Sequence, residues 1–294
     1  MDKLVITVTV DSSMSFPNCP YCPDPKDVDR VAEEYVQCVK AGASMVHMHG
    51  VHKLEDEIQP DGRKLSRIDF EGWKRMKGLI EAEVKPVFQF GIASARLPEK
   101  IKLMSLHPDL MSYCFTSHDE NFAPDPMFPE NDIYATHPRA ELVEFCKIAD
   151  DHGVKVEVES FSTGAYYDMR YVAKRAPLPG PIWTTLFLGW PGGQWTPPTP
   201  QGLVFMVENL PQMKVGLNWN VSCMDVDQHW QVLTQAINMG GHVRVGWEDN
   251  PYVTPGVFAK HSHELVDKIV RISHEMGREV ATPEEARKII FGKK

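Results

Sequence analysis

The chain has 294 residues, of which 43% are hydrophobic and 24% charged, and its formal net charge is −9 at pH 7. This composition is ordinary for a globular protein and supplies enough apolar side chains for a core. The negative charge argues against nucleic acid or an anionic membrane as a partner, and no apolar run approaches the roughly 18 residues of a membrane span. Six scattered cysteines do not resemble a disulfide framework, and "MDKLVITVTV" lacks a signal-peptide layout, so we expect a cytoplasmic protein.

Short strand-like runs alternate with amphipathic helical patterns along the whole chain. The predicted strands are Leu4–Val10, Met45–His49, Pro86–Phe90, Leu110–Cys114, Val154–Ser160, Ile182–Leu188, Val215–Trp219 and Val243–Gly246. The predicted helices are Lys26–Gly42, Asp69–Ile80, Pro98–Ser105, Arg139–His152, Gly164–Arg175, Thr199–Glu208, Val226–Met239 and His261–Met276. Strands that alternate with helices imply right-handed βαβ units and a parallel sheet.

Eight such units in one chain favour an α/β protein with the (β/α)₈ architecture, a TIM barrel. We expect one TIM-barrel domain over residues 1–294, because no linker or low-complexity tract divides the sequence. An open doubly wound sheet is the alternative fold. Against a dinucleotide site of that kind, the turn after the first strand, "DSSMSFPNCP", lacks the pattern G-x-G-x-x-G.

Two histidines end the second predicted strand, in the stretch "ASMVHMHG". Side chains two apart on a strand share a face, so His47 and His49 point the same way. In a TIM barrel, catalytic side chains lie at the C-terminal ends of the strands. We therefore expect both imidazoles in the barrel mouth.

The last predicted strand and its turn, "GHVRVGWEDN", carry an unusual amount of charge. Arg244 and Glu248 share one face, and Asp249 follows in the turn. A buried, unpaired charge is costly, so these residues require a partner or a function. The second and eighth strands flank the first at about 10 Å from each other. His47, His49 and Glu248 can therefore meet at one ion with bonds of about 2.0–2.2 Å.

Two histidines and one carboxylate leave a coordination position open, which is the catalytic pattern of zinc. Iron held by a facial triad has the same ligands and is the alternative metal. The structural alternative is that the histidines pack in the core and the charges of the last strand form salt bridges.

Four stretches resemble the β-keto acid cleavage enzyme family, whose named member is the 3-keto-5-aminohexanoate cleavage enzyme. They are "AGASMVHMHG", "EVESF", "GGHVRVGWEDN" and "REVATPEEARKII". The resemblance implies a zinc-bearing TIM barrel, an acyltransferase that reacts a β-keto acid with acetyl-CoA. The products are acetoacetate and the CoA thioester of the remaining acid.

Carried over by motif position, the resemblance implies that His47, His49 and Glu248 are the zinc ligands. Arg244 and Asp249 match the family's catalytic arginine and aspartate, with Asp249 as general base. The assisting catalytic glutamate of the family lies in "EVES", at either Glu157 or Glu159, and spacing does not choose between the two.

The chain departs from the family pattern at positions expected to contact substrate. Met14 falls where the amino-substrate enzyme has an acidic residue, and either Gly91 or Ser94 aligns with a family serine. Gly50 stands where many relatives carry an arginine. The reaction class survives these changes, whereas the identity of the β-keto acid and the residues that bind CoA stay open.

Other motifs have simpler interpretations. "CPYC", Cys19 to Cys22, matches a redox motif, but the following "PDP" blocks the helix that such a motif needs, so we expect an ordinary loop. His261 and His263, two apart on a predicted helix, lie about 200° apart and are not expected to share a metal. "WPGGQW" follows the sixth strand and either shapes the pocket or forms a plain turn.

Two alternative functions are a metal-dependent hydrolase of the amidohydrolase type and a non-catalytic binding protein with the same fold. The hydrolase would carry its H-x-H motif on the first strand, where this chain has none. For the enzyme we expect a small-molecule β-keto acid and acetyl-CoA as partners. We also expect a homo-oligomer, with a tetramer favoured, from the closing helix "EEARKII" and an apolar barrel exterior.

Overall fold

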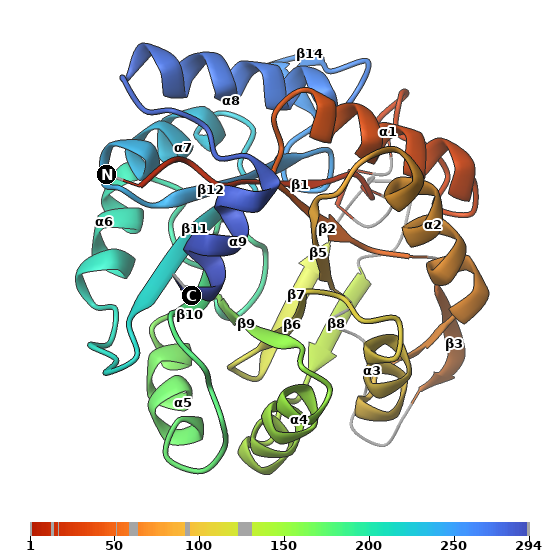
Figure 1. Ribbon diagram of the computed structural model, residues 1–294, viewed down its shortest axis with the longest axis vertical. Helices are drawn as coiled ribbons and strands as arrows, with labels where there is room; N and C mark the ends of the chain where they lie inside the picture. Colours follow the sequence, from red (N-terminus) through yellow and green to blue (C-terminus); the bar gives the residue numbers. More distant parts are fainter. Residues whose placement is uncertain are drawn as a thin grey trace.

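The computed structural model describes residues 2–12, 15–16, 18–50, 52–58, 64–91, 95–122 and 131–292. In this part of the chain, eight parallel strands close into a barrel in the order β1–β12–β11–β10–β9–β6–β5–β2 (Figure 1). The barrel strands are β1 (Ile6–Thr9), β2 (Met45–Met48), β5 (Val87–Phe90), β6 (Leu110–Cys114), β9 (Lys155–Ser160), β10 (Ile182–Leu188), β11 (Leu217–Cys223) and β12 (His242–Gly246). The predicted TIM barrel and its strands are confirmed.

Helices cover the outside of the barrel between consecutive strands. They are α1 (Val28–Lys40), α2 (Phe70–Glu83), α3 (Leu97–Met104), α4 (Arg139–Asp151), α5 (Gly164–Val172), α6 (Pro200–Glu208), α7 (His229–Asn238) and α8 (His263–Glu275). Each corresponds to a predicted helix, with ends that differ by at most three residues. Strand β11 differs more, because it continues to Cys223 through "NVSC", where the polar Asn220 and Ser222 are buried.

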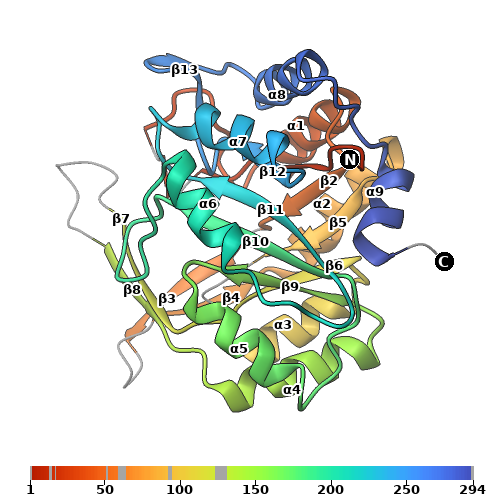
Figure 2. The ribbon, with the colours of Figure 1, turned by 90° about the vertical axis from the view of Figure 1, so that its left-hand side faces the viewer.

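Three antiparallel hairpins were not predicted. They are β3 (His52–Ile58) with β4 (Lys64–Ile68), β7 (His118–Phe122) with β8 (Asn131–Ala135), and β13 (Tyr252–Thr254) with β14 (Val257–Phe258). Each follows a barrel strand at its C-terminal end, where the long loops of this fold carry the site. In Figure 2 they lie at the end of the barrel opposite to the C-terminal helix.

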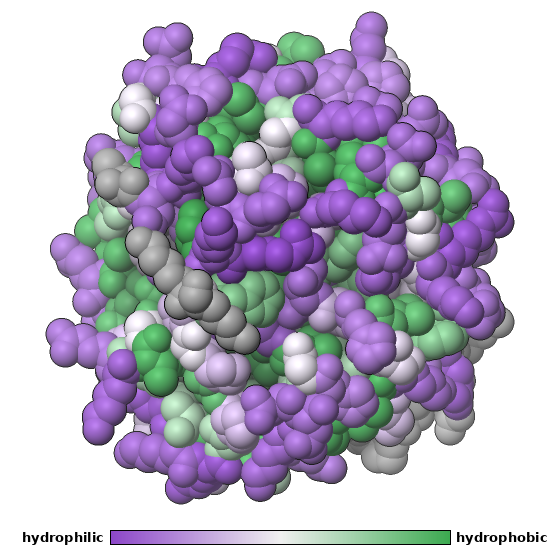
Figure 3. Space-filling view, in the orientation of Figure 1, coloured by the Kyte–Doolittle hydropathy of each residue, from purple (hydrophilic) through white to green (hydrophobic). Residues whose placement is uncertain are grey.

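The C-terminal helix α9 (Pro283–Phe291) closes the other end of the barrel. Thr282 and Glu285 form a capping box at its start. Its inner face completes an apolar floor, made of Val5, Met45, Val87, Leu110, Trp183, Ala281, Ala286 and Ile290. Figure 3 shows this end from outside, where hydrophilic side chains cover most of the surface.

One level above this floor, the barrel strands carry a layer made entirely of polar residues. Residues two further along the strands point inward there, and all are buried: Thr7, His47, Gln89, Ser112, Glu157, Thr185, Asn220 and Arg244. Polar groups buried in this way need partners. The barrel therefore carries a continuous layer of buried hydrogen-bonding groups and charges above its floor.

Strand register fixes the height of the residues that follow β2 and β12. Thr9 of β1 pairs with His47 on one side and with Gly246 on the other. The backbone of Gly246 has a φ of 131°, and a Cβ there would lie 1.8 Å from the carbonyl oxygen of Thr9. The amides of Asp249 and Asn250 both donate to the Gly246 carbonyl, which forms the turn that carries Glu248.

Among the residues that the structure describes, no helix combines the length and apolarity needed to cross a membrane.

We predict that Gly246→Ala lowers the free energy of unfolding by about 3 kcal/mol or more, because a methyl group meets both an unfavourable φ and the Thr9 backbone. Gly256→Ala is the matched control, since Gly256 also has a positive φ, 79°, but no atom lies within 4 Å of the point that a Cβ would occupy. It should cost only about 1 kcal/mol. Chemical denaturation measures both, and equal losses would contradict this account of Gly246.

Candidate metal centre and active site

The position of His47 is fixed by two contacts, one to its imidazole and one to its backbone. Its Nδ1 lies 2.8 Å from Oε1 of Gln89, the residue beside it on β5. A carbonyl oxygen accepts a hydrogen bond, so Nδ1 carries the proton and the lone pair of Nε2 is free to bind a metal. The hydroxyl of Tyr35, on α1, donates to the backbone carbonyl of His47 at 2.7 Å.

The side chains of His49 and Glu248 meet His47 at one point. Nε2 of His47 lies 2.9 Å from Nε2 of His49, and Nε2 of His49 lies 3.4 Å from Oε2 of Glu248. Ligand atoms of all three residues lie within 4.8 Å of one another. The structure therefore brings together the three residues that the sequence indicated as one cluster.

Glu248 is anchored by two hydrogen bonds besides its contact with His49. Its Oε1 accepts from Nη2 of Arg244 at 2.7 Å, and its Oε2 accepts from the hydroxyl of Thr9. Although burial opposes ionisation, Arg244 and His49 hold the pKa of Glu248 well below its usual range. The group is therefore a carboxylate, as a metal ligand must be.

The two histidines differ in their electrostatic surroundings. Burial, followed by the charge of Arg244, holds the pKa of His47 well below its usual value, so this imidazole is neutral. Burial also opposes protonation of His49, but the nearby Glu248 outweighs it and raises the pKa of His49. Glu248 thus favours positive charge beside the two imidazoles, and the donor set of two imidazoles and one carboxylate suits zinc.

Asp249 turns its carboxylate toward Arg244 and not toward the histidines. Nε of Arg244 donates to both carboxylate oxygens, at 3.2 and 3.0 Å, and Nη2 donates to Oδ1 at 2.8 Å. Burial raises the pKa of Asp249 to about 6, with Arg244 opposing the shift and Glu248 adding to it. A carboxylate with such a pKa is basic enough to accept a proton near neutral pH.

The two glutamates of "EVES" have different neighbours. Glu157 accepts hydrogen bonds from the hydroxyls of Ser112 and Thr185, and burial together with Glu159 raises its pKa to about 7. Glu157 is also close enough to Arg244 for each charge to shift the pKa of the other. Glu159 instead accepts from the thiol of Cys114 at 2.7 Å.

Aromatic side chains pack beside Arg244, a feature that the sequence pattern did not reveal. The guanidinium carbon of Arg244 lies 5.3 Å from the ring centre of Phe187 and 5.8 Å from that of Trp190. Phe161 stacks on Phe187 with ring centres 4.4 Å apart. Trp190 opens the "WPGGQW" stretch, which was the only sequence signal for this cluster. Together these rings exclude water from the arginine and strengthen its ion pairs.

Two glycines beside the histidines have structural reasons. Gly91 lies against the ring of His47, and a Cβ at this position would come within 2.3 Å of Cε1. A Cβ on Gly50 would come within 2.3 Å of the Trp73 indole. Met14 and Ser94 lie outside the described residues, so the predicted substrate contacts of Met14, Gly91 and Ser94 stay predictions.

Two further motifs, for which the sequence predicted no functional role, differ in how far the structure agrees with that prediction. Cys19 and Cys22 are free thiols in an irregular loop, as expected. The helical spacing expected for His261 and His263 is wrong, because α8 begins at His263 and His261 precedes it. The separation of 200° therefore does not apply, and the two rings stack with centres 5.3 Å apart.

Comparison with known proteins places this chain in a family. A sequence model of the β-keto acid cleavage enzyme family matches residues 3–291. A 3-keto-5-aminohexanoate cleavage enzyme of Fusobacterium nucleatum is 33% identical over 308 residues, with 100% of both chains covered. A 3-dehydrocarnitine:acetyl-CoA trimethylamine transferase of Rhizobium meliloti is 27% identical over 281 residues, which cover 88% of this chain and 87% of that protein.

A solved structure supports the fold independently. The structure of apo ObcA superposes with a TM-score of 0.68 at 16% identity, over 92% of this chain and 65% of the ObcA chain. At that identity the likeness shows the fold alone. The full-length family match confirms the predicted resemblance and the prediction of an enzyme, and it sets the hydrolase alternative aside: the chain belongs to the β-keto acid cleavage enzyme family.

Proposed function

We propose that this enzyme is a zinc-dependent acyltransferase, which converts a β-keto acid and acetyl-CoA into acetoacetate and a new acyl-CoA. The observation that carries the proposal is the convergence of His47, His49 and Glu248 directly beside the buried pair of Arg244 and Asp249. Acetyl-CoA as the second substrate is supported by the Rhizobium meliloti relative, whose name contains it.

In this proposal, His47, His49 and Glu248 hold the zinc ion, whose chemistry is to polarise a carbonyl group as a Lewis acid. Asp249 takes a proton from the carbon between the keto and carboxylate groups of the substrate. That carbon then forms a bond to the acetyl group of acetyl-CoA, and the thiolate is displaced. The thiolate then attacks the original keto carbon of the substrate, the old carbon–carbon bond breaks, and the new acyl-CoA forms. Asp249 returns its proton to the carbanion that is released, which gives acetoacetate. All atoms of the two substrates are thereby accounted for.

Arg244 orients the base in this scheme. Its planar guanidinium binds Asp249 through two nitrogen atoms and Glu248 through one, so it fixes the base relative to the metal ligands. Phe187 and Trp190 cover the guanidinium and keep water from the ion pair. The acyl group that is transferred is not specified by these contacts.

Three expectations remain proposals of the same kind. We infer that residues 1–294 form one domain, because α9 packs on the same floor as β1. A cytoplasmic location and a homo-oligomer, with a tetramer favoured, are also proposed. Helix α9 is not a source of interface surface on its inner side, since Ala286 and Ile290 are buried within the chain.

We predict that the purified enzyme forms acetoacetate from acetyl-CoA and at least one member of a β-keto acid panel, and that Asp249→Asn lowers turnover by roughly 10²–10⁴-fold. The asparagine keeps the size of the side chain but loses its charge and basic lone pair. Arg244→Lys should also lower turnover, because lysine lacks the planar fork that binds two oxygens. Near-normal activity of Asp249→Asn would refute the mechanism, whatever the metal content.

We predict that His49→Ala and Glu248→Gln each lower the zinc content by one equivalent per chain and abolish turnover, whereas Asp249→Asn retains the metal. Zinc is measured by elemental analysis after dialysis. His152→Ala is the control, since His152 is an exposed histidine at the end of α4, away from the cluster. Zinc loss should also follow acidification, because the ligands bind only when deprotonated. Unchanged occupancy in His49→Ala would rule out this ligand set.

We predict that Glu157, and not Glu159, assists catalysis by compensating the charge of Arg244 at the floor side of the site. Glu157→Gln should lower kcat more strongly than Glu159→Gln, with little change in KM, because the effect passes through Arg244 and Asp249 and not through substrate binding. The two variants are matched in size and lie two residues apart on β9. Steady-state kinetics with both substrates decides, and the reverse ranking would assign the role to Glu159.

A further inference from the structure

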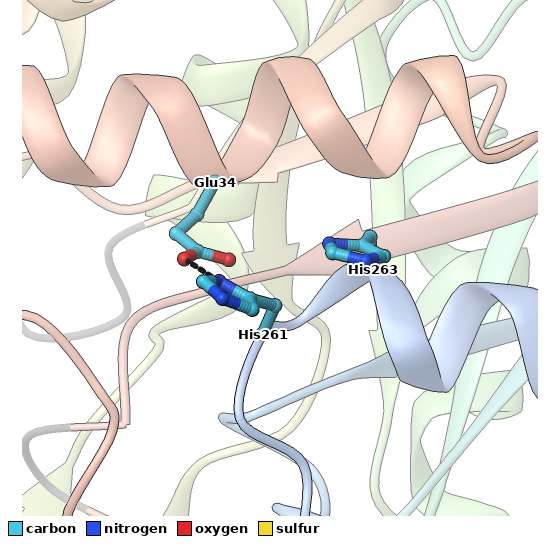
Figure 4. A group of neighbouring side chains, drawn as sticks. All are labelled: Glu34, His261 and His263. Atoms are coloured by element: carbon cyan, nitrogen blue, oxygen red, sulfur yellow. Dashed lines mark hydrogen bonds and ion pairs between the residues drawn. The ribbon is translucent and has the colours of Figure 1, made fainter.

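A second cluster of ligand-type side chains lies outside the barrel, between α1 and α8. Figure 4 shows Glu34 of α1 directed toward His261, with His263 beside it at the start of α8. One ligand atom from each of the three residues lies within 4.8 Å of the other two. None of these residues contributes to the site in the barrel mouth.

Glu34 is more deeply buried than a surface carboxylate usually is. Its side chain is only 8% exposed, and its Oε2 accepts a hydrogen bond from the amide of Ser262 at 3.1 Å. This contact places an anion at the N-terminal end of α8, where it offsets the positive end of the helix. Its other oxygen, Oε1, lies 2.9 Å from Nδ1 of His261. Capping explains the first contact, whereas the second places an imidazole beside the buried carboxylate, with the ring of His263 stacked on that of His261.

His263 supplies the observation that points to a ligand. Its Nδ1 is buried and has no hydrogen-bond partner among the described residues. Leaving a buried polar atom unpaired costs about 1–3 kcal/mol. The ring of His263 stacks on that of His261 with an interplanar angle of 17°. For nitrogen atoms of both rings to bind one ion, the imidazole of His263 must rotate about its side-chain bonds. The His261 side chain, at 58% exposed, opens this side of the cluster to solvent.

We propose that Glu34, His261 and His263 form a second, structural zinc site. Two imidazoles and one carboxylate are a donor set that zinc accepts, and the buried carboxylate supplies the negative charge that a divalent cation requires. The ion takes the place of the proton between Glu34 and His261 and gives Nδ1 of His263 a partner. Because the His261 side chain is 58% exposed, water completes the coordination.

The position of this site gives it a structural role. Helix α1 follows the first barrel strand and α8 follows the last, and β1 pairs with β12 where the barrel closes. An ion held by both helices therefore ties the first βα unit to the last across that closure. It stabilises the folded barrel without contacting the residues of the barrel mouth.

The experiment separates the two metal sites. Equilibrium dialysis against micromolar zinc should give two equivalents per chain for the wild type and one for Glu34→Gln or His261→Ala, with turnover close to that of the wild type. Glu34→Gln keeps the size and the acceptor for the Ser262 amide, and His261 is exposed, so neither change removes core packing. His274→Ala, at the other end of α8 and 50% exposed, is the matched control and should keep both equivalents.

Thermal unfolding then tests the structural role in a background that lacks the metal site of the barrel mouth. Adding zinc to His49→Ala should raise Tm by several degrees, and this rise should vanish in His49→Ala combined with Glu34→Gln. A wild-type zinc content that His261→Ala leaves unchanged, or equal zinc loss in His274→Ala and His261→Ala, would overturn the proposal. Neither result depends on whether the enzyme forms acetoacetate.

Discussion

The structure of the barrel mouth depends on one buried guanidinium. Arg244 is 1% exposed, and such a charge is tolerated in an interior only when it is fully paired. Glu248 and Asp249 both pair with it. The two carboxylates outnumber the single guanidinium, so the three side chains together carry a net negative charge. That excess favours a cation at the point where Glu248 faces the two histidines. A single arginine thereby links Glu248, which we propose binds metal, to Asp249, which we propose accepts a proton.

Backbone geometry makes this arrangement possible. Thr9 lies level with His47 and with Gly246, and its hydroxyl reaches Glu248 from the strand between them. The tight contact between Gly246 and the Thr9 carbonyl allows the chain to turn immediately after β12. Charged residues that are adjacent in sequence thus point to different partners, with Glu248 toward the histidines and Asp249 toward the arginine.

Much of this was predictable from the sequence, because it rests on local periodicity. The alternation of strands and helices predicted the barrel, and the two-residue period of a strand predicted that His47 and His49 share a face. Contacts that depend on register between strands were not predictable, such as the hydrogen bond between Gln89 and His47. The same limit left Glu157 and Glu159 unresolved, since both point inward and only their neighbours distinguish them. At His261 the prediction failed because a helix start was placed two residues too early.

The C-terminal helix that closes the barrel floor also limits how molecules reach the polar layer of the barrel. With Ala286 and Ile290 filling one end, a molecule that reaches the polar layer of the barrel comes from the other end. Any two molecules bound there together share one path, so the deeper one must enter first and leave last. Under the proposed function, the barrel itself would then set the order of addition and release, independently of any catalytic side chain.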